Sequence, residues 1–405
     1  MNATGEPVPT WTPRTVRGTT PASSYDTVLA HEHVFIDLRC WLDSDDPLHD
    51  VLGDQRVHAG NLELVRQNPF ACPDNLVLDD MELAVRELTR LAEASPRPLL
   101  VDLTPDTTGR DPRRLAEVSA RTGVDIIAGC GPYIDGSWPD SLRRATPEQL
   151  ADAMVAALTD PDHPAGVIGE IGTGSPVTEC ETTALIAAAQ AHRRTGAPVF
   201  VHLHPWHPEG AASLDILERH GVDPARISLC HLDVRGPADI PLLTSLLDRG
   251  CHIAFDIWGD EHQYGRVRMP KDTERLRALL RLIELGYGDR LTHSHDVCTR
   301  TQLAEFGGVG YDHLPRNLPG WLRDAGLDPE TVHQQLAGNA LRFLGISPRP
   351  AAPEPVTPPL PDWFRRAVPG LAETGSGRPS KYRIKFAPPR RLHSRDLRRT
   401  AYGHA

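Results

Sequence analysis

Short apolar runs alternate along this chain with longer segments in which apolar residues recur at helical spacing. The short runs are rich in aliphatic and β-branched residues, which is typical of strands that are buried on both faces. They cover residues 27–30, 99–103, 124–128, 166–168, 199–201, 227–229, 252–255 and 290–294. The longer segments cover 79–94, 112–121, 182–195, 211–220 and 272–285, and four of them are followed by a glycine, as helices often are.

This alternation predicts an α/β fold with a parallel sheet. Eight strands joined by right-handed crossovers can close into a (β/α)8 TIM barrel, and this is the fold that we predict. A doubly wound open sheet is the alternative, but no G-x-G-x-x-G follows the first strand. Such barrels take about 250 residues and tolerate insertions, so a chain of 405 residues has room for one barrel with additions.

The composition changes near residue 348. From residue 351 onward the chain has eleven Lys and Arg, four Asp and Glu, and nine Pro, with few apolar residues and no periodicity. We therefore predict three parts: an N-terminal extension over 1–22, the barrel over 23–348, and a Pro-rich basic C-terminal tail over 349–405 that is largely disordered. An alternative reading of the tail is a basic arm that contacts an acidic partner, a membrane surface or nucleic acid.

The overall composition excludes several classes of protein. Hydrophobic residues make up 40% and charged residues 24%, as in globular proteins, and no apolar run approaches the roughly 20 residues of a membrane span. The first 22 residues lack the pattern of a signal peptide, so we expect a cytoplasmic protein. Seven scattered cysteines without a CxxC pair argue against both a disulfide framework and a thiolate zinc site. We expect a small-molecule substrate and no nucleic-acid partner, and a homodimer remains open.

Candidate chemistry begins at the first predicted strand, which leads into His31-Glu32-His33. Residues two apart on a strand point to the same face, so His31 and His33 are expected to aim together and Glu32 to point away toward structural contacts. An isolated H-x-H is weak evidence for a metal site, because such histidines are more often ordinary core or surface residues.

Later strands strengthen the metal hypothesis. The fourth strand leads into Glu170, the fifth into His202, the sixth into His231 and the eighth into Asp296. Barrel enzymes carry their active sites at the carboxyl ends of the strands, so these side chains are expected to meet at one mouth. Four histidines and two carboxylates suit two divalent ions, of which zinc is the expected one, with Glu170 shared between them.

These residues resemble the phosphotriesterase-related proteins of the amidohydrolase superfamily. The resemblance extends over about residues 15–346 and rests on several motifs taken together. They are Thr15-Val16-Arg17-Gly18, His31-Glu32-His33, Val101-Asp102-Leu103-Thr104-Pro105, Gly109-Arg110-Asp111-Pro112, Gly166-Val167-Ile168-Gly169-Glu170-Ile171-Gly172, His231-Leu232-Asp233, Ser294-His295-Asp296 and Phe306-Gly307-Gly308-Val309-Gly310-Tyr311.

The resemblance implies a set of metal ligands. His31 and His33 would hold the more buried metal together with Asp296, and His202 and His231 would hold the more exposed one. His204, which would share the face of His202, is an alternative ligand. Glu170 stands where phosphotriesterases carry a carbamylated lysine, and this departure favours the related branch that resembles carboxyl-ester, lactone or amide hydrolases.

We therefore predict a binuclear metal-dependent hydrolase in which a metal-bridging hydroxide cleaves a small carboxyl ester, lactone or amide. Asp296 would be the catalytic residue that moves the proton to the leaving group, unless it serves as a ligand only. Phosphotriester hydrolysis, a lyase or isomerase reaction, and a non-hydrolytic binding protein on the same barrel are the alternatives.

Other candidate residues lie around the predicted mouth. We expect substrate contacts from Tyr133, Asp256 and Trp258. Arg300 and Arg110 could each bind a substrate carboxylate or form structural ion pairs, and Arg300 is the one that we predict to contact substrate. His295 and Asp233 are expected to orient ligands or a proton path.

Overall fold

The computed structural model describes residues 9–21 and 24–346, and the predicted tail over 349–405 lies outside them. Eight parallel strands form two ladders, in the order β1-β4-β5 and β6-β7-β8-β9-β12. They are β1 (Thr27–Glu32), β4 (Pro98–Asp102), β5 (Asp125–Ala128), β6 (Ile168–Gly172), β7 (Val199–His202), β8 (Ile227–Leu229), β9 (His252–Phe255) and β12 (Leu291–His293). Each of the eight predicted strands overlaps one of these.

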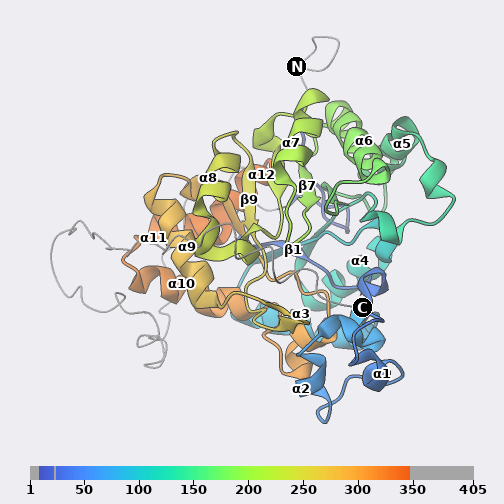
Figure 1. The fold of residues 1–405 in the computed structure, drawn as a ribbon. Coiled ribbons are helices and arrows are strands. Elements are labelled where there is room, and N and C mark those ends of the chain that lie inside the picture. Colours follow the sequence, from blue (N-terminus) through green and yellow to red (C-terminus); the bar gives the residue numbers. More distant parts are fainter. Residues whose placement is uncertain (1–8, 22–23, 347–405) are drawn as a thin grey trace, which may run out of the picture. The chain divides into compact units, whose positions relative to one another are not determined.

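Backbone hydrogen bonds join the two ladders at both seams. Gly166 donates to the carbonyl of Ala128 at 2.8 Å between β5 and β6, and Asp296 donates to the carbonyl of His31 at 3.2 Å between β12 and β1. The strands therefore close into the predicted (β/α)8 barrel, and Figure 1 shows the helices arranged around β1, β7 and β9.

Helices follow the strands along the chain. They are α3 (Met81–Ala94), α4 (Pro112–Thr122), α5 (Pro147–Leu158), α6 (Glu179–Thr195), α7 (Gly210–Arg219), α8 (Ile240–Leu247), α9 (Asp272–Glu284), α10 (His313–Asp324), α11 (Pro329–His333) and α12 (Asn339–Leu344). Local sequence explains their ends. The side chain of Thr178 caps α6 in a capping box with Glu181, and Gly196 ends the same helix in the left-handed conformation at φ 82°.

Two large buried clusters hold the barrel together. Leu100 and Ile253 belong to the first, in which strand residues pack with residues of the surrounding helices. The second joins strand residues such as Phe200 to Phe343 of α12, whose rings are 5.1 Å apart. Because Asn339 of α12 donates to the carbonyl of Leu291, the first residue of β12, α12 lies at the strand starts and leaves the opposite end for the site.

Several short elements lie in the segments that connect strands to helices. The long segment between β1 and α3 contains β2 (Ile36–Asp37), α1 (His49–Leu52), α2 (Leu62–Val65) and β3 (Val77–Leu78), and the segment after β9 contains β10 (Gln263–Tyr264) and β11 (Val267–Arg268). In the predicted N-terminal extension, Trp11 donates to the carbonyl of Gly166 at 2.7 Å and packs against the barrel. Among the described helices, none has the length and apolar character that crossing a membrane requires.

Candidate active site

The six predicted metal ligands come together from five strand ends. Nε2 of His33 lies 3.0 Å from Oδ1 of Asp296, and Nε2 of His31 lies 3.3 Å from Oε2 of Glu170. On the other side of Glu170, Nδ1 of His202 lies 3.2 Å from the same oxygen and 2.8 Å from Nε2 of His231. Barrel closure thus brings together residues from 31 to 296 of the chain.

Glu170 lies at the centre of this cluster. Its Oε2 faces His31, His202 and His231 at 3.3, 3.2 and 3.6 Å. Its Oε1 faces His33 at 3.5 Å. One carboxylate thus contacts both histidine pairs, which is the arrangement that a shared ligand requires.

Burial and charge indicate that the cluster suits cations. Glu170 is only 2% exposed, and among the described residues its Oε2 and the Nε2 of His31 have no hydrogen-bond partner. Burial raises the pKa of Glu170, but His31 and His202 together hold it well below the usual range. Burial lowers the pKa of His31, but Glu170, Asp296 and Asp256 raise it well above its usual value. Buried donors that attract positive charge and lack other partners fit divalent ions.

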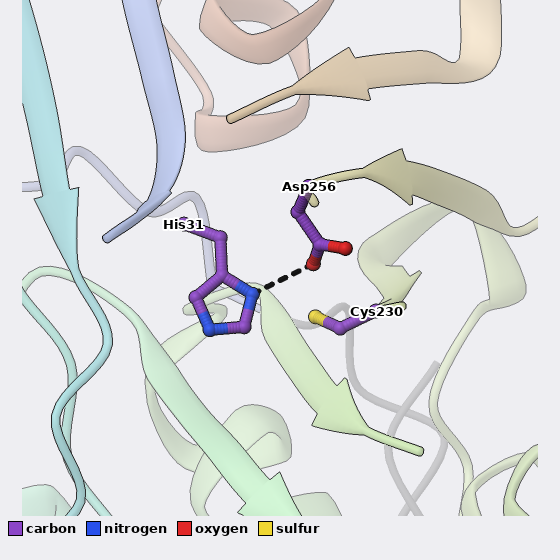
Figure 2. A group of neighbouring side chains, drawn as sticks. All are labelled: His31, Cys230 and Asp256. Atoms are coloured by element: carbon purple, nitrogen blue, oxygen red, sulfur yellow. Dashed lines mark hydrogen bonds and ion pairs between the residues drawn. The ribbon is translucent and has the colours of Figure 1, made fainter. Parts of the chain in front are cut away.

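A second layer stands behind the cluster. Figure 2 shows His31 beside Asp256 and Cys230. Nδ1 of His31 lies 2.7 Å from Oδ2 of Asp256. The other oxygen of Asp256 accepts a hydrogen bond from the backbone of His231 at 2.8 Å. One buried carboxylate therefore orients a histidine from each pair, as carboxylates behind metal ligands do. Asp256, which the sequence suggested as a substrate contact, is fully buried and contacts His31 and His231.

Comparison with known proteins identifies the family. Residues 12–344 match the phosphotriesterase family over most of the chain. The chain belongs to the phosphotriesterase family. It is 31% identical to an N-acetyltaurine hydrolase of Tetraodon nigroviridis over 339 residues, which cover 82% of this chain and 97% of that protein.

Solved structures agree with this assignment. A resiniferatoxin-binding protein from Rhodobacter sphaeroides superimposes with a TM-score of 0.79 at 34% identity and covers 84% of this chain and 96% of its own. A variant of a phosphotriesterase-like lactonase from Deinococcus radiodurans superimposes with a TM-score of 0.64 at 28% identity and covers 82% of this chain and all of its own. The protein is accordingly a hydrolase of the phosphotriesterase family with the TIM barrel of that family.

Within this family barrel, Tyr133 is the predicted substrate contact that reaches the cluster. Its hydroxyl lies 3.2 Å from Nδ1 of His202 and accepts a hydrogen bond from Nε1 of Trp41 at 3.2 Å. Burial and the charge of Glu170 raise the pKa of Tyr133 well above its usual value, so the phenol stays protonated.

Two other predicted substrate contacts lie away from the cluster. Trp258 is fully buried, and its Nε1 donates to Nδ1 of His293 at 3.3 Å, because the chain turns inward after β9. Arg300 donates to the carbonyl of Asp74 at 2.8 Å and pairs with the Asp74 and Asp79 carboxylates. Arg300 thus has the structural ion pairs that were its alternative role, and a substrate contact by Trp258 stays a prediction.

The backbone adopts a conformation that is rare for residues other than glycine at two of the clustered residues. His231 and Asp296 adopt left-handed conformations at φ 64° and 52°, which cost energy in residues other than glycine and persist where the surroundings enforce them. Around Asp296 the enforcing group is Glu32, which is fully buried and accepts hydrogen bonds from the backbones of His295 and Val297 at 2.8 and 2.9 Å. Glu32 thus points to structural contacts, as predicted, and these contacts hold Asp296.

The two predicted orienting residues have separate partners. Nδ1 of His295 lies 2.7 Å from Glu32, and its Nε2 accepts from the backbone of Leu314 at 3.1 Å. Asp233 accepts from the backbone of Ile257 and from Arg275 at 3.1 and 3.0 Å. Both therefore act on the loops that carry the site. The pairing of Asp256 with His31 could not be read from the chain, since it links positions 225 residues apart.

Proposed function

We propose that the clustered residues hold two divalent metal ions, zinc being the expected one, and that the protein hydrolyses a small carboxyl ester, lactone or amide. The observation that carries this proposal is the buried Glu170 carboxylate, which faces four histidines within 3.6 Å. His31, His33 and Asp296 would form one half of the site, and His202 and His231 the other. A cation in each half would satisfy donors that otherwise stay buried without partners.

Bound divalent ions would supply water of lowered pKa and polarise a substrate carbonyl. The protein's own groups would handle the protons. Asp296 retains 15% exposure of its side chain, whereas Glu170 has 2%, so Asp296 is the clustered carboxylate that substrate can reach. Its Oδ2 lies 3.8 Å from the His231 ring and makes no closer contact there. Asp296 is therefore suited to accept the proton of the attacking water and to return it to the leaving group.

Tyr133 is suited to act on the other side of the carbonyl. Its hydroxyl lies beside His202 and accepts from Trp41, so its own proton remains available to a substrate oxygen. Because charge builds on that oxygen during attack, a fixed hydroxyl donor there would stabilise the transition state. We keep His202 rather than His204 as the ligand, because Nδ1 of His202 lies 3.2 Å from Oε2 of Glu170, whereas Nδ1 of His204 accepts from the backbone of Trp206 at 3.3 Å.

Carbonyl substrates are favoured over phosphotriesters for two reasons. A glutamate stands where phosphotriesterases carry the carbamylated lysine. Relatives of this chain are named as an amidase, the N-acetyltaurine hydrolase, and as a lactonase. Non-hydrolytic binding of a small molecule is the second candidate function, because one related structure is named a resiniferatoxin-binding protein.

The test is a comparison of kcat/KM on matched lactone, ester, amide and phosphotriester substrates, using zinc-loaded protein. We expect a carbonyl substrate to lead, with one solvent ¹⁸O incorporated into the acid product. A clear lead for the phosphotriester would overturn the substrate class. Retention of zinc with no turnover on any substrate would favour the binding protein.

A further inference from the structure

Four aromatic side chains gather from three loops at the mouth of the barrel. Trp41 and Phe70 come from the segment after β1, Trp206 from the loop after β7, and Tyr264 from the segment after β9. Their ring centroids are close: 5.7 Å between Trp41 and Phe70, 4.8 Å between Phe70 and Tyr264, and 6.0 Å between Tyr264 and Trp206. Trp206 in turn lies 6.3 Å from Trp41, which completes a ring of contacts that we call the aromatic collar.

The aromatic collar borders the clustered ligands. The ring of Trp41 lies 6.0 Å from that of His202, and its Nε1 donates to the Tyr133 hydroxyl. Trp41, Phe70 and Trp206 all keep part of their surface exposed. A substrate whose reacting carbonyl lies beside His202 and Tyr133 would therefore have its remote end against these rings.

Two charged groups next to the aromatic collar, Asp260 and Arg235, already have partners within the protein. Asp260 accepts from the Tyr264 hydroxyl at 2.6 Å and from the backbone of His262 at 3.0 Å. Arg235 pairs with Asp239 at 2.5 Å and donates to the carbonyl of Trp206 at 3.0 Å. The collar thus offers apolar ring surface rather than a charge that would select an ionised group.

One polar atom of the aromatic collar stands out. Nε1 of Trp206 is buried and has no hydrogen-bond partner among the described residues. A buried N–H group without a partner is costly, and indole N–H groups in such places usually find an acceptor. This donor is therefore available to a bound molecule.

From these observations, and resting on the hydrolysis proposed above, we propose that the aromatic collar binds an uncharged apolar group of the substrate. The substrate class is a neutral ester, lactone or amide whose acyl or leaving group is aromatic or branched aliphatic, with an acceptor atom within reach of Nε1 of Trp206. This separates the chain from its N-acetyltaurine-hydrolysing relatives, since N-acetyltaurine carries a compact acyl group and an anionic sulfonate.

The test compares kcat/KM on two substrate pairs with zinc-loaded protein. One pair varies size at constant charge, as N-benzoyl against N-acetyl amides of one neutral amine. The other varies charge at constant size, as the free carboxylate against the methyl ester of one N-acyl amino acid. We expect the benzoyl substrate and the neutral substrate to lead by about 10-fold or more, since apolar contacts of this size discriminate by such factors.

Substitutions at Trp206 test whether the aromatic collar causes the preference for the benzoyl amide over the acetyl amide. Trp206→Ala should lower kcat/KM for the benzoyl amide by about 10–100-fold and leave the acetyl amide within about 2-fold. Trp206→Phe keeps a ring and loses the donor, so its loss on the benzoyl amide should be smaller, about 5-fold. Val51→Ala, an exposed apolar residue at 52% exposure in the segment after β1, is the matched control and should change nothing.

Two results would overturn the inference while leaving the proposed hydrolysis intact. One is a lead for the anionic or acetyl substrates in the unmodified protein. The other is an equal loss on both amides in Trp206→Ala with zinc content unchanged. Failure of the proposed function would look different, because a phosphotriester would then lead or no carbonyl substrate would be turned over at all.

Discussion

At the scale of single residues, the ligand cluster was predictable because each member lies at the carboxyl end of a predicted strand. Closure of the barrel is enough to bring these six side chains together, because the strands of a parallel barrel all end at the same mouth. The orienting partners were not predictable, since Asp256 and Glu32 find their partners only through closure. The place of the Trp258 ring was not predictable for the same reason, since nothing in the local sequence shows that it turns inward toward His293.

Replacing Glu32 tests whether it positions Asp296. Both carboxylate oxygens of Glu32 accept hydrogen bonds, three at Oε1 and one from the backbone of Val297 at Oε2, so the NH2 of a glutamine would face a backbone N–H group in either orientation. We expect Glu32→Gln to weaken zinc binding by about 10–100-fold and to lower kcat/KM with it, measured by competition with a chromogenic chelator.

The matched control is Glu87→Gln. Glu87 is also buried and accepts from two backbone groups, those of Ala304 and Glu305 at 3.0 and 2.9 Å. This variant should lose thermal stability but keep its zinc affinity. Equal zinc affinity in the two variants would show that Glu32 has a structural role only.

At the scale of elements, the eight strands and main helices followed from periodicity, whereas short elements did not. Strands such as β8 and β9 begin and end as predicted, because aliphatic runs are read directly from the chain. The two-residue strands β10 and β11 pair only with each other and are too short to leave a pattern. They belong to a segment that depends on α9 for its position.

Arg275 of α9 holds that segment. It is fully buried, donates to the carbonyls of Pro270 and Asp260 at 2.7 and 2.9 Å, and pairs with Asp233 and Asp272 at 3.0 and 3.2 Å. Arg275→Met would leave the buried Asp233 carboxylate without its ion-pair partner, which costs about 3 kcal/mol. We expect Tm to fall by roughly 5 °C or more, measured by differential scanning calorimetry.

Arg281→Met on the exposed side of the same helix is the control for that change. Arg281 pairs with Glu284 at 2.6 Å in solvent, with 40% of its side chain exposed, so its loss should move Tm by no more than about 1 °C. If the Arg275 and Arg281 variants had the same Tm, the buried network would not hold the segment.

At the scale of the whole molecule, buried histidines set how stability depends on pH. Burial, aided by the positive charge of Arg290, lowers the pKa of His252 to about 4, and burial lowers that of His293 to about 4. Both stay neutral in the folded state, while the unfolded chain takes up their protons below about pH 6.5. The contribution of these two histidines to the free energy of unfolding is therefore fully present above pH 6.5 and is lost as the pH drops toward 4.

His252→Phe should reduce this loss. Its ring already packs 4.7 Å from that of Phe343, so a phenyl ring fits the site. Between pH 6.5 and 4 the decline in unfolding free energy should become shallower by up to about 1.4 kcal/mol per pH unit. The measurement is urea unfolding over a pH series, with His58→Phe in an exposed loop as the control. An unchanged slope in His252→Phe would contradict the assignment.

The barrel should also function without residues 351–405, which lie outside the described part of the chain. The clustered residues span 31–296, and the family match ends at 344, where α12 also ends. A chain that ends at Pro350 should keep its zinc content and its kcat/KM within about 2-fold. A large loss of activity at unchanged Tm would make the basic tail part of the site.

The proposed site depends on one buried carboxylate, that of Glu170, which would join the two metal-binding halves. The most direct measurement is equilibrium dialysis of chelator-stripped protein against zinc, with bound zinc counted per chain for the unmodified protein and for Glu170→Gln. We predict about two zinc ions for the unmodified protein and a marked loss in Glu170→Gln, since the amide removes a charge from between four histidines. Less than one zinc per chain in the unmodified protein, or two in Glu170→Gln, would contradict the account.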